Sequence, residues 1–307
     1  MKTQNIQKIY DIHAHYSTEK PGLASDAGKL GFNVHIHTAA EHVETMNHLG
    51  IARALISCPT QKYLDDKKAC IEYIQEVNDI GASMVRDYPD RFDLCCALPL
   101  PYVDEAMEEL DRVINSYDVK ALILTSNANG QYLGNPQLRP LFEKINSLKL
   151  PVLLHPAAPL EYPKGTIAAK VLPMFEFIAD TTRTVLDIMA AGYLEDFSDV
   201  KLIIPHSGSC LPMAIDRYMQ TMRVTGRNPG VHMEQLYFDI ACDPYPSCVP
   251  ALLQITTPDH IFLGSDYPAI PEFVVASNIE HTQSDKYFSK KEIESILWGN
   301  AEKLLMS

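Results

Sequence analysis

The chain has 307 residues, of which 46% are hydrophobic, and it carries a formal net charge of −13 with a pI of about 5.2. The acidic balance leaves no basic surface for nucleic acid or an anionic membrane, so we expect neither as a partner. No apolar run approaches the roughly 20 residues of a membrane-spanning helix. The length is ordinary for one α/β barrel domain with a large core.

The cysteines and the first residues bear on where the protein works. There are seven cysteines, an odd number, at irregular spacing and without a C-x-x-C motif. This usage is typical of reduced thiols in an intracellular protein. The run KIYDIHAH near the N-terminus enters a predicted strand at once and leaves no room for a signal peptide. We therefore expect a cytoplasmic protein.

Short apolar, β-branched runs recur along the chain and alternate with helical patterns. Amphipathic patterns at 63–88 and 102–117 predict helices, and a pattern at 290–305 predicts a last helix that covers the final strand. Eight such units predict a parallel sheet closed into a (β/α)8 TIM barrel that spans residues 1–307 as a single domain. The predicted strands lie near 8–12, 51–57, 93–98, 120–125, 151–155, 200–205, 236–241 and 260–265.

Two segments are predicted to be long loops over one end of the barrel. They run from Tyr16 to Ala40 and from Ala157 to Thr166. Loops of this length in a compact domain are usually functional. His35 and His37 lie in the first loop, where they could line a pocket or simply face solvent.

Four predicted strands end in side chains that can bind a metal. They end in His13-Ala-His15, His155, His206 and Asp266. In a barrel these carboxyl ends meet at one mouth, where such enzymes build their sites. His13 and His15 are two residues apart on a strand, so both point to the same side of the barrel wall. Together with His155 and Asp266 they predict one divalent ion, with Zn²⁺ the best match and Mn²⁺ or Fe²⁺ possible.

Each of these residues also has an ordinary structural explanation. Strand histidines are often hydrogen-bonded core residues, and Asp266 could cap the segment that follows it. The set is more informative than any member, because chance seldom places four such residues at strand ends.

The runs DIHAH, LLHP, IIPHSG and GSDYP resemble the amidohydrolase superfamily. They are most similar to its amidohydrolase-related branch, which holds aminocarboxymuconate-semialdehyde decarboxylase and the o-hydroxybenzoate decarboxylases. The most specific block, residues 180–218, is similar to the 6-methylsalicylate decarboxylase-like group. The resemblance covers nearly the whole chain. It implies metal ligation and a catalytic histidine outside the ligand set; the implied ligands are His13, His15, His155 and Asp266, and the implied catalytic histidine is His206.

Two arginines are candidates for substrate binding. The resemblance implies that Arg217 reaches the substrate carboxylate of a neighbouring subunit, so we expect a homodimer or a higher homo-oligomer. Arg183 could hold a substrate carboxylate. Alternatively, Arg183 forms a salt bridge within its helix, near Asp180 or Asp187.

The chain departs from the family pattern at three places. Binuclear relatives have a carboxylated lysine after the fourth strand, where this chain has Thr125-Ser126, so one metal is expected. Where the family has the motif HxGG, this chain has His206-Ser207-Gly208-Ser209, with serine in place of the last glycine. No arginine follows the first loop until Arg53, which argues against the aminocarboxymuconate semialdehyde as substrate.

The function that these features predict is metal-dependent decarboxylation of a small hydroxy-aromatic or enoic carboxylic acid. A bound divalent ion acts as a Lewis acid, His206 can transfer a proton at neutral pH, and the resemblance implies Asp266 as proton donor. The same residues permit hydrolysis of a lactone, ester or amide, and only the 180–218 block favours decarboxylation. A barrel that binds a metabolite without activity would be favoured by a lost ligand, and none is lost.

Overall fold

The computed structural model describes residues 8–16, 37–59, 65–166, 170–284 and 286–306. Within this part, eight parallel strands form one sheet, and each overlaps a predicted strand. A two-stranded antiparallel pair, β5 (Asn127–Ala128) and β6 (Gln131–Tyr132), follows the fourth strand. In sheet order the eight are β1 (Ile9–His15), β2 (Ile51–Ser57), β3 (Phe92–Ala97), β4 (Val119–Thr125), β7 (Val152–His155), β8 (Leu202–Ile204), β9 (Leu236–Asp239) and β10 (Ile261–Phe262).

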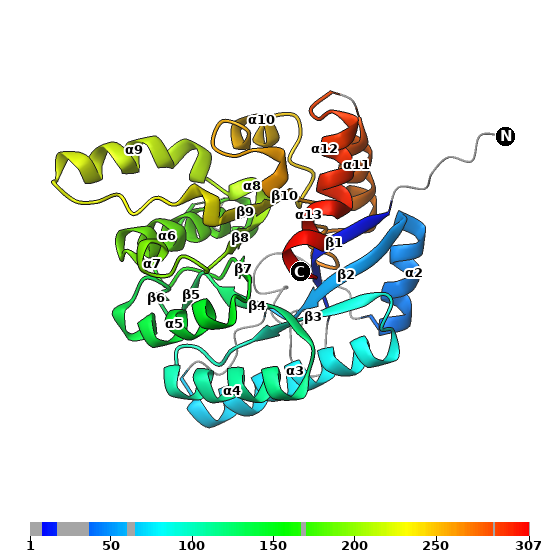
Figure 1. Ribbon diagram of the computed structural model, residues 1–307, viewed down its shortest axis with the longest axis horizontal. Coiled ribbons are helices and arrows are strands. Elements are labelled where there is room, and N and C mark those ends of the chain that lie inside the picture. The colour runs from blue at the N-terminus through cyan, green and yellow to red at the C-terminus, as the bar shows by residue number, and fades with distance from the viewer. Residues whose placement is uncertain (1–7, 17–36, 60–64, 167–169, 285, 307) are drawn as a thin grey trace.

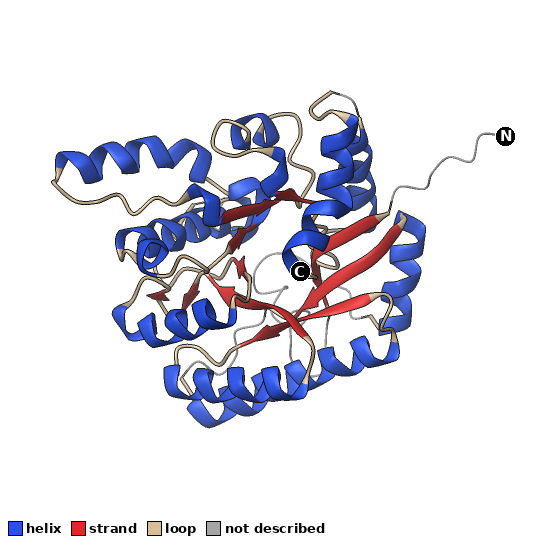
Figure 2. Cartoon of the chain, in the orientation of Figure 1, coloured by secondary structure: helices blue, strands red, loops and turns tan. Residues whose placement is uncertain are grey.

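Helices surround the strands, as Figures 1 and 2 show. The helices predicted at 63–88 and 102–117 are confirmed as α3 (Lys67–Asp87) and α4 (Val103–Ser116). The α-helices are α2 (Ala39–Leu49), α3 (Lys67–Asp87), α4 (Val103–Ser116), α5 (Arg139–Leu148), α6 (Glu176–Ala190), α7 (Tyr193–Asp196), α8 (Pro205–Gly208), α9 (Leu211–Val224), α10 (Cys248–Leu252), α11 (Glu272–Gln283), α12 (Lys290–Glu294) and α13 (Asn300–Leu305). Short 3₁₀ turns are η1 (Pro136–Leu138), η3 (Leu172–Met174), η4 (Met233–Gln235) and η5 (Pro258–His260).

The barrel closes between its last strand and its first. The backbone N–H of Ile12 donates to the carbonyl of Leu263 at 3.1 Å, and that of Asp266 donates to the carbonyl of His13 at 2.7 Å. The N–H of His15 donates to the carbonyl of Tyr267, also at 2.7 Å. These bonds confirm the predicted (β/α)8 barrel, and they place the segment after β10 directly beside the two histidines of β1.

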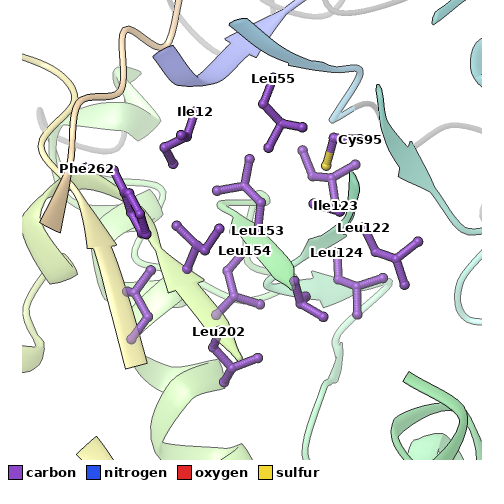
Figure 3. Packing of buried hydrophobic residues seen from close by; sticks show 14 of the residues in the cluster. Ile12, Leu55, Cys95, Leu122, Ile123, Leu124, Leu153, Leu154, Leu202 and Phe262 are labelled. Atoms are coloured by element: carbon purple, nitrogen blue, oxygen red, sulfur yellow. The ribbon is translucent and has the colours of Figure 1, made fainter. Parts of the chain in front are cut away.

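The strands are rich in apolar residues because both faces of the sheet are covered. In β4, the consecutive residues Leu122, Ile123 and Leu124 are each at most 3% exposed. Figure 3 shows their packing with side chains from neighbouring strands, among them Ile12, Leu55, Cys95, Leu153, Leu154, Leu202 and Phe262.

Two helix boundaries differ from the sequence prediction. The first predicted loop ends before Ala39, because Thr38 and Glu41 form a reciprocal capping box that starts α2 there. The last predicted helix is interrupted between α12 and α13 by a π-helical turn, η6 (Ser295–Gly299). The carbonyl of Ile296 in this turn accepts the backbone N–H of Leu263 at 3.1 Å, which draws it out of the regular helical ladder.

Two further expectations concern the chain as a whole. Among the described residues, no helix is both long enough and apolar enough to cross a bilayer. All seven cysteines lie in the described part of the chain, and none of them forms a disulfide, in keeping with the predicted reduced thiols.

Candidate metal centre and active site

Four side chains converge at the mouth of the barrel, and they are the four predicted as metal ligands. The Nε2 atoms of His13 and His15 are 3.1 Å apart, and His15 Nε2 lies 3.0 Å from Asp266 Oδ1. With His155 from β7, all the potential ligand atoms lie within 4.8 Å of one another, and all four residues are buried. The fold therefore brings together residues that are more than 250 positions apart in the sequence.

Partners on the far side of the rings orient the two histidines of β1. Nδ1 of His13 lies 2.8 Å from Oδ2 of Asp239, and Nδ1 of His15 lies 2.9 Å from Oγ of Ser57. The Ser57 hydroxyl in turn donates to the carbonyl of Ala14, so its oxygen accepts from His15. Both rings thus carry their proton on Nδ1 and present Nε2 as a free lone pair.

His155 is oriented in the same way. Its Nδ1 lies 3.0 Å from the carbonyl oxygen of Pro156, which can only accept, so Nδ1 carries the proton. Three unprotonated nitrogens and a carboxylate oxygen then face one another with no hydrogen between them. A divalent cation fits this set, because it supplies the positive charge that the converging lone pairs lack.

The charge states of His15, His155 and Asp266 agree with this fit. Burial, reinforced by His15 and His13, holds the pKa of His155 well below its usual value, and burial also lowers the pKa of His15. Burial would raise the pKa of Asp266, but the neighbouring imidazoles of His15, His206 and His13 hold that pKa well below its usual value. At neutral pH His15 and His155 are therefore neutral and Asp266 is ionised, the forms that bind metals. His13 differs: burial opposes its charged form, but the charge and hydrogen bond of Asp239 raise its pKa.

A glycine allows the segment after β10 to lie so close to β1. A Cβ at Gly264 would lie 2.9 Å from Cβ of His13 and 3.0 Å from Cβ of Asp239, closer than real Cβ contacts. Asp266 itself has a left-handed backbone, with φ of 56°. Such strained conformations are typical of functional sites, where the surroundings hold them in place.

His206 lies beside the histidine cluster, with its ring centroid 5.6 Å from that of His13. Its Nε2 is 3.4 Å from Oδ2 of Asp266, whereas His15 faces Oδ1. Its backbone N–H donates to Oδ1 of Asp239 at 2.9 Å. Burial opposes the charged form of His206, but the hydrogen bond and charge of Asp266 and the charge of Asp239 raise its pKa. His206 therefore forms a proton-sharing pair with Asp266 at the edge of the metal cluster.

The turn that presents His206 is unusual. His206, Ser207, Gly208 and Ser209 all have positive φ, between 56° and 76°. Three of these residues are not glycine, and the left-handed region costs such residues free energy. This is the segment in which the chain departs from the family's HxGG.

The structure places the two candidate arginines differently. Arg183 donates from Nη1 to Asp180 Oδ1 at 2.8 Å and to the Tyr132 hydroxyl at 2.9 Å. This contact is the salt bridge within the helix that the sequence allows as the second interpretation of Arg183. Arg217 is exposed on α9, at the upper left of Figure 1. Their roles toward a substrate stay predictions.

The loop histidines have separate outcomes. His35 lies outside the described residues, as does most of the first predicted loop. His37 is buried, and its Nε2 lies 2.8 Å from Nδ1 of His42. The ring of Tyr267, the residue after Asp266, lies 5.2 Å from both imidazole rings. His37 therefore packs beside the barrel mouth and is not a solvated loop residue.

Sequence reasoning missed three side chains at this site. Asp239 and Ser57 orient the metal-cluster histidines, and Cys242 places its Sγ 3.7 Å from Oδ2 of Asp266. Asp239 could have been found, because it ends the strand LYFD, as Asp266 follows the strand IF. Ser57 and Cys242 give no comparable signal in the sequence.

Comparison with known proteins adds independent information. A family model described as amidohydrolase matches residues 10–306. A 6-methylsalicylic acid decarboxylase from Penicillium expansum is 26% identical over 202 residues, which is 62% of this chain and 62% of the relative. A gamma-resorcylate decarboxylase from a Rhizobium species is 30% identical over 206 residues, 64% of this chain and 61% of the relative. The matched region is thus less than two thirds of the length of either relative.

The fold is also similar to a solved structure, that of a dihydroxybenzoic acid decarboxylase from a Polaromonas species. The two superpose with a TM-score of 0.85 over 98% of this chain and 97% of the other, at 21% sequence identity. That crystal contains manganese and the inhibitor 2-nitroresorcinol. At this identity the likeness demonstrates a shared fold.

Proposed function

We propose that this chain, which belongs to the amidohydrolase family, is a metal-dependent decarboxylase of a small hydroxy-aromatic or enoic carboxylic acid. Family membership confirms the resemblance seen in the sequence. The observation that carries the proposal is the position of Asp266, with one oxygen among the histidine Nε2 atoms and the other toward His206. The partial matches to two named decarboxylases support the choice of reaction.

The metal part of the proposal rests on the donor set. His13, His15 and His155 would contribute Nε2, and Asp266 would contribute Oδ1, to a single divalent ion. When bound, such an ion supplies Lewis acidity that grips a carboxylate and an adjacent oxygen. We favour Zn²⁺ because three imidazoles and one carboxylate suit it, and Mn²⁺ and Fe²⁺ are the alternatives.

The proton part rests on the pair formed by His206 and Asp266. In decarboxylation, the bond between the substrate carbon and its carboxylate breaks, CO₂ leaves, and a proton takes the electron pair on that carbon. Burial opposes the charged form of His206, but the hydrogen bond and charge of Asp266 raise its pKa, so His206 can carry the proton that is transferred. His206 therefore acts as general acid, directly or through Asp266.

We further propose that Arg217 binds the substrate carboxylate in a neighbouring subunit of a homodimer. Arg217 shares one exposed face of α9 with Met213, which is 78% exposed, and Val224, which is 81% exposed. Positions four and seven residues apart lie on the same side of a helix. Large apolar side chains beside an arginine support a protein contact on this face.

The test is a panel of small acids run beside a panel of lactones, esters and amides. CO₂ release would be followed for salicylate-type and enoic acids that carry a hydroxyl or keto group next to the carboxylate. We expect CO₂ and the decarboxylated product from at least one acid. Hydrolysis of an ester, lactone or amide without CO₂ from any acid would replace this proposal with the hydrolase alternative.

A further inference from the structure

A second group of metal-binding atoms adjoins the first. His206 Nε2, Cys242 Sγ and Asp266 Oδ2 lie within 4.8 Å of one another. Cys242 follows β9 in a left-handed conformation, with φ of 66°, and it retains solvent-exposed surface. The group includes Oδ2 of Asp266, whereas His15 contacts Oδ1.

The spacing of these atoms matches one tetrahedral ion. A zinc ion with bonds of about 2.0 Å to nitrogen and oxygen and about 2.3 Å to sulfur places N and O about 3.3 Å apart, and S and O about 3.5 Å apart. The observed separations are 3.4 Å between His206 Nε2 and Asp266 Oδ2, and 3.7 Å between Cys242 Sγ and the same oxygen. These two separations are within a few tenths of an ångström of the tetrahedral values, and His206 Nε2 lies within 4.8 Å of Cys242 Sγ.

We propose that His206, Cys242 and Asp266 form a second, weaker site for a thiophilic divalent cation, whose occupation inhibits the enzyme. Asp266 would bridge the two ions, with Oδ1 toward the histidine cluster and Oδ2 toward the second ion. The site is weaker because it has three protein ligands and shares its carboxylate. Binding releases the thiol proton to solvent as the sulfur–metal bond forms.

The chemistry of the donors predicts which ions bind. Imidazole and thiolate suit Zn²⁺, Cd²⁺ and Co²⁺, whereas Mn²⁺ prefers oxygen ligands. Excess Zn²⁺ should therefore fill the second site, and excess Mn²⁺ should not. An ion held by His206 removes that imidazole from proton transfer. This inhibitory consequence rests on the proposed function, but the binding itself does not.

The binding test uses protein that already holds one metal ion. The protein would be dialysed against increasing concentrations of Zn²⁺, Co²⁺ or Mn²⁺. Elemental analysis would measure the bound metal, and for Co²⁺ the absorption of the thiolate-to-metal charge-transfer band would also be recorded. The variant is Cys242→Ser, and the matched control is Cys248→Ser, an exposed cysteine six residues further on. We expect a second Zn²⁺ or Co²⁺ in the wild type and in Cys248→Ser, with the charge-transfer band.

In Cys242→Ser, the affinity for the second ion should fall by more than about tenfold and the band should vanish, since even loss of an outer-shell partner costs 10–100-fold. The first ion should stay bound, which also verifies that the variant is folded. Equal binding by the wild type and Cys242→Ser would identify a surface ion and overturn the proposal. So would a wild type that takes up no second Zn²⁺.

The activity test separates this inference from the proposed function. Excess Zn²⁺ should inhibit CO₂ release in the wild type and Cys248→Ser more strongly than in Cys242→Ser, and excess Mn²⁺ should inhibit none of them. If no acid is decarboxylated, the proposed function fails while the stoichiometry and the charge-transfer band still decide the site. If the second ion binds without inhibition, the inhibitory role is wrong.

Discussion

Nδ1 of His13 lies 2.8 Å from Oδ2 of Asp239, and both side chains are fully buried. A carboxylate behind a metal-binding imidazole fixes its tautomer and raises its basicity. The other oxygen of Asp239 accepts the backbone N–H of His206, so one buried carboxylate holds a predicted ligand and the predicted acid together.

We therefore predict that Asp239→Asn weakens metal binding by about 10–100-fold, the usual effect of losing such a partner. The measurement is competition for the metal with a chelator of known affinity. Asp243→Asn is the control, because Asp243 pairs with His281 and Ser277 and not with the histidine cluster. An Asp239→Asn protein with unchanged metal affinity would contradict the orienting role.

His155→Ala should lose metal and activity together. The imidazole supplies one of four ligand atoms, and the vacated position is buried. Elemental analysis after gel filtration should find one divalent ion in the wild type and much less in the variant. His260→Ala should retain the ion, since His260 stacks on Tyr237 with ring centroids 4.4 Å apart. Two tightly held ions in the filtered wild type would refute the mononuclear centre.

His206→Ala should keep its metal but lose turnover by roughly 10²–10⁴-fold, the range for a positioned acid or base. The reason is that His206 faces Oδ2 of Asp266 and lies outside the cluster formed around Oδ1. Metal content and kcat would be measured on the same preparation. A folded variant that purifies without metal would make His206 a ligand.

The fold and the ligand set could be predicted because their signals are local. Each strand is a short apolar run, and His13, His15, His155 and Asp266 stand at or just beyond the ends of such runs. The carboxyl ends of all barrel strands lie at the same mouth of the barrel. Residues found at strand ends in the sequence are therefore expected to be neighbours in space.

The remainder depends on contacts that no local pattern encodes. Ser57 orients His15 only because β1 pairs with β2 in the observed register, which sets His15 opposite Ser57. Cys242 lies close to Asp266 because the turn after β9 has a left-handed conformation at Cys242. No pattern in the sequence predicts this conformation. In the π-helical turn, the carbonyl of Ile296 accepts the backbone N–H of Leu263, a contact between segments more than 30 residues apart.

Acid should destabilise the protein partly through His42. Burial, with His37, His15 and Arg91 nearby, lowers the pKa of His42 from 6.5 to about 3. Between pH 6.5 and 3, His42 therefore binds a proton in the unfolded state but not in the folded state. The contribution of His42 to the free energy of unfolding is complete above pH 6.5 and declines as the pH falls toward 3. The loss is about 1.4 kcal/mol per pH unit for one such group.

The measurement is the free energy of unfolding from denaturant titrations at several pH values. His42→Gln should be less stable than the wild type near neutral pH, because it disturbs the packing against His37, Phe92 and Tyr267. Its dependence on pH should nevertheless be shallower, since the titrating group is gone. Parallel curves for the two proteins would show that His42 does not titrate in this window.

Arg217 provides the test of a shared active site. A guanidinium grips a carboxylate with two parallel hydrogen bonds, which the single ammonium of lysine cannot reproduce. Arg217→Lys should therefore raise KM or abolish turnover, with unchanged metal content. Because Arg217 is exposed on α9, the substitution should alter the free energy of unfolding by less than about 0.5 kcal/mol. A substantial loss of stability would instead make Arg217 a structural residue.

If Arg217 acts across a dimer interface, two inactive variants should complement each other. His206→Ala subunits retain Arg217, and Arg217→Ala subunits retain His206, so a mixed dimer has one intact composite site. Unfolding the two variants together and refolding them should therefore restore part of the wild-type CO₂ release, whereas each variant refolded alone should stay inactive. If mixed dimers are present by mass and no activity returns, each site is completed within its own chain.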